Sequence, residues 1–151
     1  MGRTDGRWPI GVQPLDHTAD VGLRADADSL AALFERMAAG MCVMVEGEGT
    51  CEDGPESGAL QPIERNVEVE APDVALLLVA WLREILHLHQ VEGLAFGGAA
   101  IERIEEATLR ARVSLRPARS DPVREIKGVT YHGLQATRRA GTWHARVIFD
   151  V

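Results

Sequence analysis

Acidic oxygen groups gather at the end of this 151-residue sequence. An alternating, strand-like run from Thr142 ends in Asp150 and Val151, so the Asp150 side chain and the α-carboxylate of Val151 are one residue apart. Two adjacent anionic oxygen groups suit a hard divalent cation such as Ca²⁺ or Mg²⁺. The alternative interpretation is an edge strand that ends with its carboxylates in water, and the terminus alone leaves both open.

A second acidic motif, DHTAD at residues 16–20, precedes a run in which apolar residues alternate with Gly or Arg from Val21 to Ala25. This alternation is typical of a half-buried strand. A carboxylate at the mouth of a strand is exposed to ligands and is also held by the sheet. Asp residues there also bond their own backbone, so turn formation is the alternative role for Asp16 and Asp20.

Two amphipathic helices are predicted from apolar residues that recur at three- and four-residue steps. The first covers Ser29–Val45, with Asp28 or Ser29 as its N-cap, and the second covers Asp73–Gln90. The second helix has a broad apolar face that includes Leu78 and Trp81. We therefore expect it to be the central helix of the core.

Nitrogen and sulfur ligands do not have the spacing of a zinc site. Cys42 and Cys51 form no CxxC motif. His87 and His89 are two residues apart on a predicted helix, where 3.6 residues per turn separates their side chains by about 200°. We therefore interpret both histidines as structural.

The strands are predicted mainly in the second half of the chain. Strict alternation predicts a strand at residues 63–70, and further alternating runs cover residues 101–104, 108–115, 123–127, 134–138 and 143–149. Helices and strands that segregate in this way predict an α+β domain. We expect a two-layer arrangement, in which two main helices pack on a mixed, mostly antiparallel sheet system.

Composition and charge limit the possible functions. A hydrophobic content of 46% in 151 residues predicts one domain, residues 15–151, preceded by a mobile Gly-, Arg- and Pro-rich extension at residues 1–14. The net charge of −7 opposes binding to a phosphate backbone, so any RNA would be held by another protein. No run of eighteen uncharged apolar residues occurs, which predicts a cytoplasmic protein with no membrane partner.

Five segments carry a resemblance to a known family: DHTADVG at residues 16–22, LLVAWLREIL at 77–86, EGL at 92–94, KGVTYH at 127–132 and FDV at 149–151. In order and spacing the chain resembles the archease family from about Leu15 to Val151. The resemblance implies a metal-binding accessory protein rather than an enzyme. It would activate the GTP-dependent RNA ligase of tRNA splicing, which joins 3′-phosphate to 5′-hydroxyl ends, by promoting guanylylation of the ligase and multiple turnover.

The family's metal ligands match Asp20, Asp150 and the terminal Val151 of this sequence. Three negative oxygen groups favour Ca²⁺ or Mg²⁺ over zinc, which prefers nitrogen and sulfur. Calcium is favoured over magnesium because it tolerates irregular coordination. Gly128 and Val151 stand where the family more often has alanine and isoleucine, and neither change removes an oxygen ligand.

Four further residues are expected near the metal. Asp16 and His17 would orient a carboxylate or a bound water from the second shell, although His17 could equally cap the strand. Lys127 and His132 would contact a nucleotide phosphate or an acidic surface of the partner. A structural role is the alternative for His132.

Two other functions stay open. A metal-dependent hydrolase would use Asp20, Asp150 and either His17 or His132 to activate water. A general chaperone or assembly factor would need an exposed apolar groove.

Overall fold

The computed structural model describes residues 8–16, 21–47, 62–105 and 107–151, and every structural statement below concerns these ranges. They contain two helices, α1 (Leu30–Glu46) and α2 (Val74–Glu92). The strands are β1 (Val12–Asp16), β2 (Val21–Ala27), β3 (Ile63–Glu70), β4 (Leu94–Ile104), β5 (Thr108–Pro117), β6 (Gly128–Val129), β7 (Gln135–Arg139) and β8 (Thr142–Asp150).

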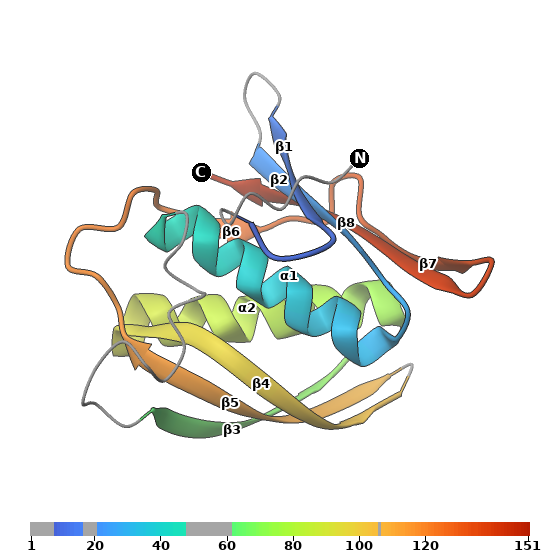
Figure 1. The fold of residues 1–151 in the computed structure, drawn as a ribbon, viewed down its shortest axis with the longest axis horizontal. Helices are drawn as coiled ribbons and strands as arrows, with labels where there is room; N and C mark the ends of the chain where they lie inside the picture. Colours follow the sequence, from blue (N-terminus) through green and yellow to red (C-terminus); the bar gives the residue numbers. More distant parts are fainter. Residues whose placement is uncertain (1–7, 17–20, 48–61, 106) are drawn as a thin grey trace.

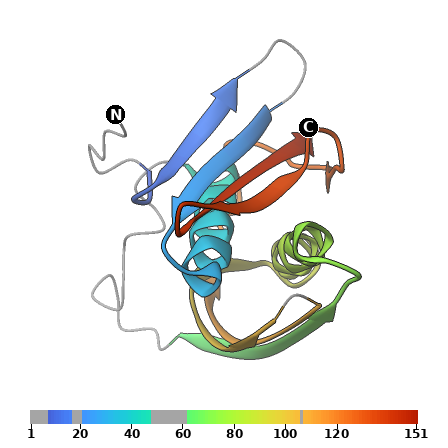
Figure 2. The same cartoon turned by 90° about the vertical axis from the view of Figure 1, so that its right-hand side faces the viewer.

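The strands form two antiparallel sheets with the helices between them (Figures 1 and 2). The larger sheet has the order β1-β2-β8-β6, with β7 also paired to β8, and the smaller has the order β3-β5-β4. Both helices contact strands of both sheets. The predicted α+β class is confirmed. The sheet system divides, however, so the helices are covered on two sides and the domain has three layers where two were expected.

Local signals define both helices. The Ser29 side chain accepts a hydrogen bond from the Ala32 amide at 3.1 Å, and Gly47 is the C-cap of α1. At the start of α2, Asp73 accepts from the Leu76 amide at 2.9 Å. The C-cap of α2 is Gly93, whose φ of 68° lies in the left-handed region that favours glycine. Such caps explain why the predicted helix boundaries are accurate to within two residues.

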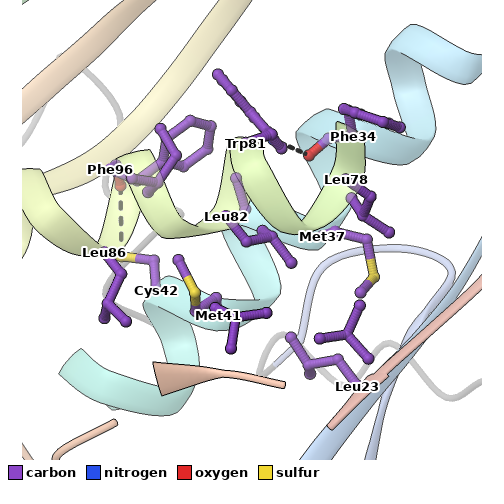
Figure 3. Close-up of a cluster of buried hydrophobic side chains, with 14 of the residues drawn as sticks. Leu23, Phe34, Met37, Met41, Cys42, Leu78, Trp81, Leu82, Leu86 and Phe96 are labelled. Carbon is purple, nitrogen blue, oxygen red and sulfur yellow. Dashed lines mark hydrogen bonds between the residues drawn. The ribbon is translucent and has the colours of Figure 1, made fainter. Parts of the chain in front are cut away.

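The core lies where α1, α2 and β4 meet (Figure 3). The fully buried Trp81 donates a hydrogen bond from Nε1 to the Phe34 carbonyl at 2.8 Å, which joins the two helices. The Phe96 ring of β4 meets the Trp81 ring edge-on at a centroid distance of 6.3 Å. Although α2 has the length and composition of a membrane span, most of its large apolar side chains pack in this core.

Two predictions about the chain's organisation are wrong. Residues 12–14, which we expected in a mobile extension, belong to β1, and Val12 is buried opposite Ala25 of β2. Gly and Pro were read as linker residues, but β1 lies at the edge of the sheet, where proline is tolerated. The run at residues 123–127 alternates but forms no strand. Its Val123 amide donates to Val45 O at the end of α1, at 2.9 Å.

Candidate metal centre at the end of β8

Asp150 is the last residue of β8, a strand that is paired on both sides. Its backbone pairs with Gly128 of β6, and the Lys127 amide donates to its carbonyl at 2.7 Å. On the other side of β8, Phe149 pairs with Val21 of β2. The Phe149 side chain is fully buried, whereas Asp150 is exposed and Val151 is 37% exposed. The sheet therefore fixes the backbone here and leaves the carboxylates open to solvent.

Asp16, the one described residue of the DHTAD motif, lies at the same edge of the sheet. Asp16 ends β1 and pairs with Val21, which begins β2 and pairs with Phe149. Asp16 is thus placed by its backbone one strand away from β8. Asp20 and His17 lie outside the described residues. The expectation that Asp20 and Asp150 act together therefore stays a prediction.

The segment that carries Lys127 and His132 runs beside the end of β8. Lys127 is exposed and is brought next to Asp150 by the hydrogen bond between their backbones. Further along, Thr130 uses its amide and its hydroxyl to donate to Ile148 O, at 3.0 and 2.9 Å. The exposed His132 follows, with its amide bonded to Thr130 Oγ1 at 3.2 Å. The structure therefore brings this segment and Asp150 to one edge of the molecule.

Arg83 of α2 supports this segment, and sequence reasoning missed it. Its NH1 and NH2 groups donate to Tyr131 Oη at 2.8 Å and to Val129 O at 2.9 Å. The guanidinium carbon also lies 4.8 Å from the centre of the Tyr131 ring, a cation–π distance. Tyr131 is 55% exposed, so an aromatic side chain is presented to solvent in a fixed orientation beside His132. The only sequence signal was that both residues fall in segments of the family resemblance.

A buried carboxylate, Glu46, anchors the loop that leads to Lys127. Glu46 ends α1 and is fully buried. Both of its carboxylate oxygens accept from the Arg119 amide at 3.2 Å, and Oε2 lies 2.8 Å from His89 Nε2. His89 therefore pairs with an acid from the other helix, in agreement with its predicted structural role. His87 is exposed.

The described residues do not contain a complete ligand set. No group of three His, Cys, Asp or Glu side chains converges within the described ranges. Asp150 supplies a carboxylate of the type that Ca²⁺ and Mg²⁺ prefer, and the expected Val151 carboxylate would follow it at the same exposed strand end. The chemistry of these two residues fits the expected cation, and Asp20 as third ligand stays a prediction.

Comparison with known proteins decides the family. The model of the archease protein family (MTH1598/TM1083) matches residues 13–151, which include both acidic motifs. The chain belongs to the archease family. Protein archease of Thermococcus kodakarensis is 35% identical over 146 residues, covering 90% of this chain and 95% of the relative. Protein archease of Pyrococcus furiosus is 31% identical over 144 residues, with the same two coverages.

Solved structures of archeases have the same fold. The solution structure of Methanobacterium thermoautotrophicum protein 1598 has a TM-score of 0.67 and 25% identity, and the match covers 93% of this chain and 99% of that one. A crystal structure of a Thermotoga maritima archease, named a possible chaperone, has a TM-score of 0.57. That match covers 92% of this chain and 96% of the other, and at 20% identity it shows the fold alone.

Proposed function

We propose that this protein is a metal-binding activator of a GTP-dependent RNA ligase that joins 3′-phosphate to 5′-hydroxyl ends, as in tRNA splicing. It would promote guanylylation of the ligase and sustain multiple turnover without being an enzyme itself. The observation that carries the proposal is membership of the archease family over residues 13–151, a range that includes both acidic motifs. The cytoplasm is the proposed location.

Asp20, Asp150 and the Val151 carboxylate would hold the cation, with calcium favoured over magnesium. Pairing of β8 with β2 and β6 supports this, because a strand held on both sides keeps its terminal ligands in a fixed position. The bound ion would supply positive charge to phosphate oxygens at the partner's active site. Asp16 and His17 remain proposed second-shell residues that orient a ligand or a water.

The same edge offers a surface for the ligase. Lys127 provides a cation beside Asp150, Tyr131 provides a rigid aromatic ring, and His132 is exposed next to it. Aromatic and charged anchors of this kind commonly dominate interface energetics. The net charge of −7 supports contact with a basic ligase and opposes direct contact with RNA. We therefore propose that RNA is engaged only through the ligase.

A chaperone is the second candidate because the Thermotoga maritima relative is named as a possible one. A chaperone would need a continuous exposed apolar surface. In the described ranges the exposed large apolar side chains come from separate parts of the chain: Ile10, Val91, Val123, Tyr131 and Val151. So few exposed apolar side chains in the described ranges do not make a large apolar groove, and the activator is therefore the favoured candidate.

The candidates differ in what the protein does alone. The experiment incubates RNA carrying 3′-phosphate and 5′-hydroxyl ends with GTP and either the protein, a cognate ligase or both. An activator gives no product alone and increases both guanylylated ligase and joined RNA when the ligase is present. RNA cleavage or phosphate release by the isolated protein would instead support a hydrolase. Ligase protected from aggregation without faster guanylylation would support a chaperone.

A further inference from the structure

A row of polar side chains crosses the outer face of the larger sheet. Gln13 of β1 pairs with Arg24 of β2, Arg24 with Arg146 of β8, and Arg146 with Gln135 of β7. Both arginines are flanked along their strands by buried residues whose side chains face the helices. Because side chains alternate along a strand, the two arginines point to the opposite face, away from the core.

Positive charge in this row is not compensated. Arg24 and Arg146 are directly opposite each other, an arrangement of like charges that destabilises a sheet. Within the described ranges no acidic group pairs with either of them or with the nearby Arg139, and Arg146 Nε is buried without a hydrogen-bond acceptor. The nearby carboxylate of Asp26 is already bonded to His144 Nδ1 at 2.6 Å.

These groups surround a small pocket of about 220 Å³. Its lining includes three arginines and one acid, Asp26, whose carboxylate bonds His144; the lining residues are Arg24, Asp26, Gln135, Arg139, His144, Ala145 and Arg146. Pockets for drug-sized ligands are usually larger, starting at about 300 Å³. The lining contains no Phe, Tyr or Trp among the described residues, so it offers no platform on which a base could stack. Its size and chemistry therefore fit one small anionic group.

We propose that this pocket binds a phosphate monoester group through Arg24, Arg139 and Arg146, with Gln135 as an additional donor. A phosphate accepts bidentate hydrogen bonds from the planar guanidinium fork. Three cations match the double negative charge of a monoester better than the single charge of a carboxylate. A bound phosphate would also give Arg146 Nε an acceptor and would separate the two opposed positive charges.

The pocket is distinct from the proposed metal centre but lies on the same strand. Arg146 precedes Asp150 by four residues on the same face of β8, a separation of about 13 Å at 3.3 Å per residue. The proposal does not depend on ligase activation. If RNA is engaged only through the ligase, as proposed above, the phosphate belongs to a free nucleotide; the end of an RNA strand is the alternative source, and the test separates the two.

The test uses the full chain and two variants, Arg24→Gln and Arg146→Gln. Arg138→Gln is the matched control because Arg138 adjoins Arg139 on β7, is also exposed, and points to the other face of the strand. Inorganic phosphate is titrated at constant ionic strength, with binding followed by amide chemical shifts and by the melting temperature. We expect shifts at residues 24, 135 and 146, and affinity about tenfold lower in both variants, as loss of a charged hydrogen bond predicts.

A second readout concerns stability without phosphate. In phosphate-free buffer Arg146→Gln should melt at or above the wild-type temperature, because it removes one of two opposed charges. Adding phosphate should raise the melting temperature of the wild type and of Arg138→Gln, with a smaller rise for the variants. The proposal is overturned if phosphate leaves the wild type unchanged, if the two variants respond like the wild type, or if a polyglutamate peptide binds more tightly than phosphate.

The final arm compares a 3′-mononucleotide with an oligonucleotide that ends in a 3′-phosphate and with the same oligonucleotide ending in a hydroxyl. Tighter binding of the phosphorylated oligonucleotide than of the mononucleotide identifies a strand end as the source, and equal binding identifies a free nucleotide. Equal binding of the two oligonucleotides would overturn the assignment of a monoester group.

Discussion

Replacement of Glu46 by leucine should destabilise the protein more than any surface charge change. Glu46 is fully buried, and its carboxylate bonds the Arg119 amide and His89. Leucine removes both contacts and leaves the Arg119 N–H and the His89 ring nitrogen without their acceptor. Removal of one member of a buried pair costs about 3–5 kcal/mol, and the apolar leucine offsets part of this, so we expect about 3 kcal/mol.

For a chain of this size about 3 kcal/mol corresponds to a fall in melting temperature of about 6–12 °C. Thermal unfolding by circular dichroism measures it. Glu46→Gln should fall between wild type and Glu46→Leu, because an amide oxygen can still accept from the Arg119 N–H. The control is Glu68→Gln, which breaks an exposed pair with Arg110 and should change stability by less than about 0.5 kcal/mol.

The effect of Glu46 should also reach the proposed site. Arg119 lies in the loop that leads to Lys127, and Lys127 bonds the backbone of Asp150. Glu46→Leu should therefore weaken ligase stimulation at temperatures where the protein is still folded. A Glu46→Leu protein that melts within about 2 °C of the wild type would refute the reasoning, since the buried carboxylate would then contribute little to holding the loop.

Three further predictions concern the core, the chain end and the partner. Trp81→Phe removes the hydrogen bond to Phe34 O and leaves a void, so urea unfolding should show a loss of about 2 kcal/mol, and an unchanged midpoint would contradict the packing described. A carboxy-terminal tag or amidation should weaken Ca²⁺ binding in calorimetry, because it neutralises the Val151 carboxylate. The same tag placed before Met1 should leave the Ca²⁺ affinity unchanged. Equal affinities of the two tagged proteins would remove Val151 from the ligand set. The association rate with the ligase should fall as the salt concentration rises, and the isolated protein should bind long RNA weakly. Tight RNA binding by the isolated protein at physiological salt would contradict the proposal that the ligase holds the RNA.

Local chemistry made the helices and most strands predictable. The caps at Ser29 and Asp73 and the apolar stripes are short-range signals, and strand β3 follows the alternation at Ile63–Glu70 residue for residue. Prediction failed for two segments whose local sequence pattern did not show which part of the fold they contact. The run at 123–127 alternates like a strand but bonds the end of α1, and β1 carries the Gly and Pro typical of a linker while occupying a sheet edge.

The candidate site was predictable only in part. Motif resemblance identified Asp150, Lys127 and His132, and the structure places all three along one edge. Spacing alone could not show that Val21 pairs with Phe149, because strand pairing between distant segments depends on the whole sheet. Arg83 and Glu46 were missed for the same reason.

Guanylylation of the ligase by GTP in the presence of Asp150→Asn is the most direct test of the proposed function. The substitution keeps size and backbone pairing and removes one negative oxygen from the proposed cation site. Glu68→Gln is the control, because Glu68 is also exposed and lies on β3 of the smaller sheet, away from the end of β8. We expect wild type and Glu68→Gln to accelerate guanylylation equally, and Asp150→Asn to lose both this acceleration and Ca²⁺ binding while its melting temperature stays unchanged. Full acceleration by Asp150→Asn would contradict the proposal that the end of β8 acts on the ligase through a bound metal.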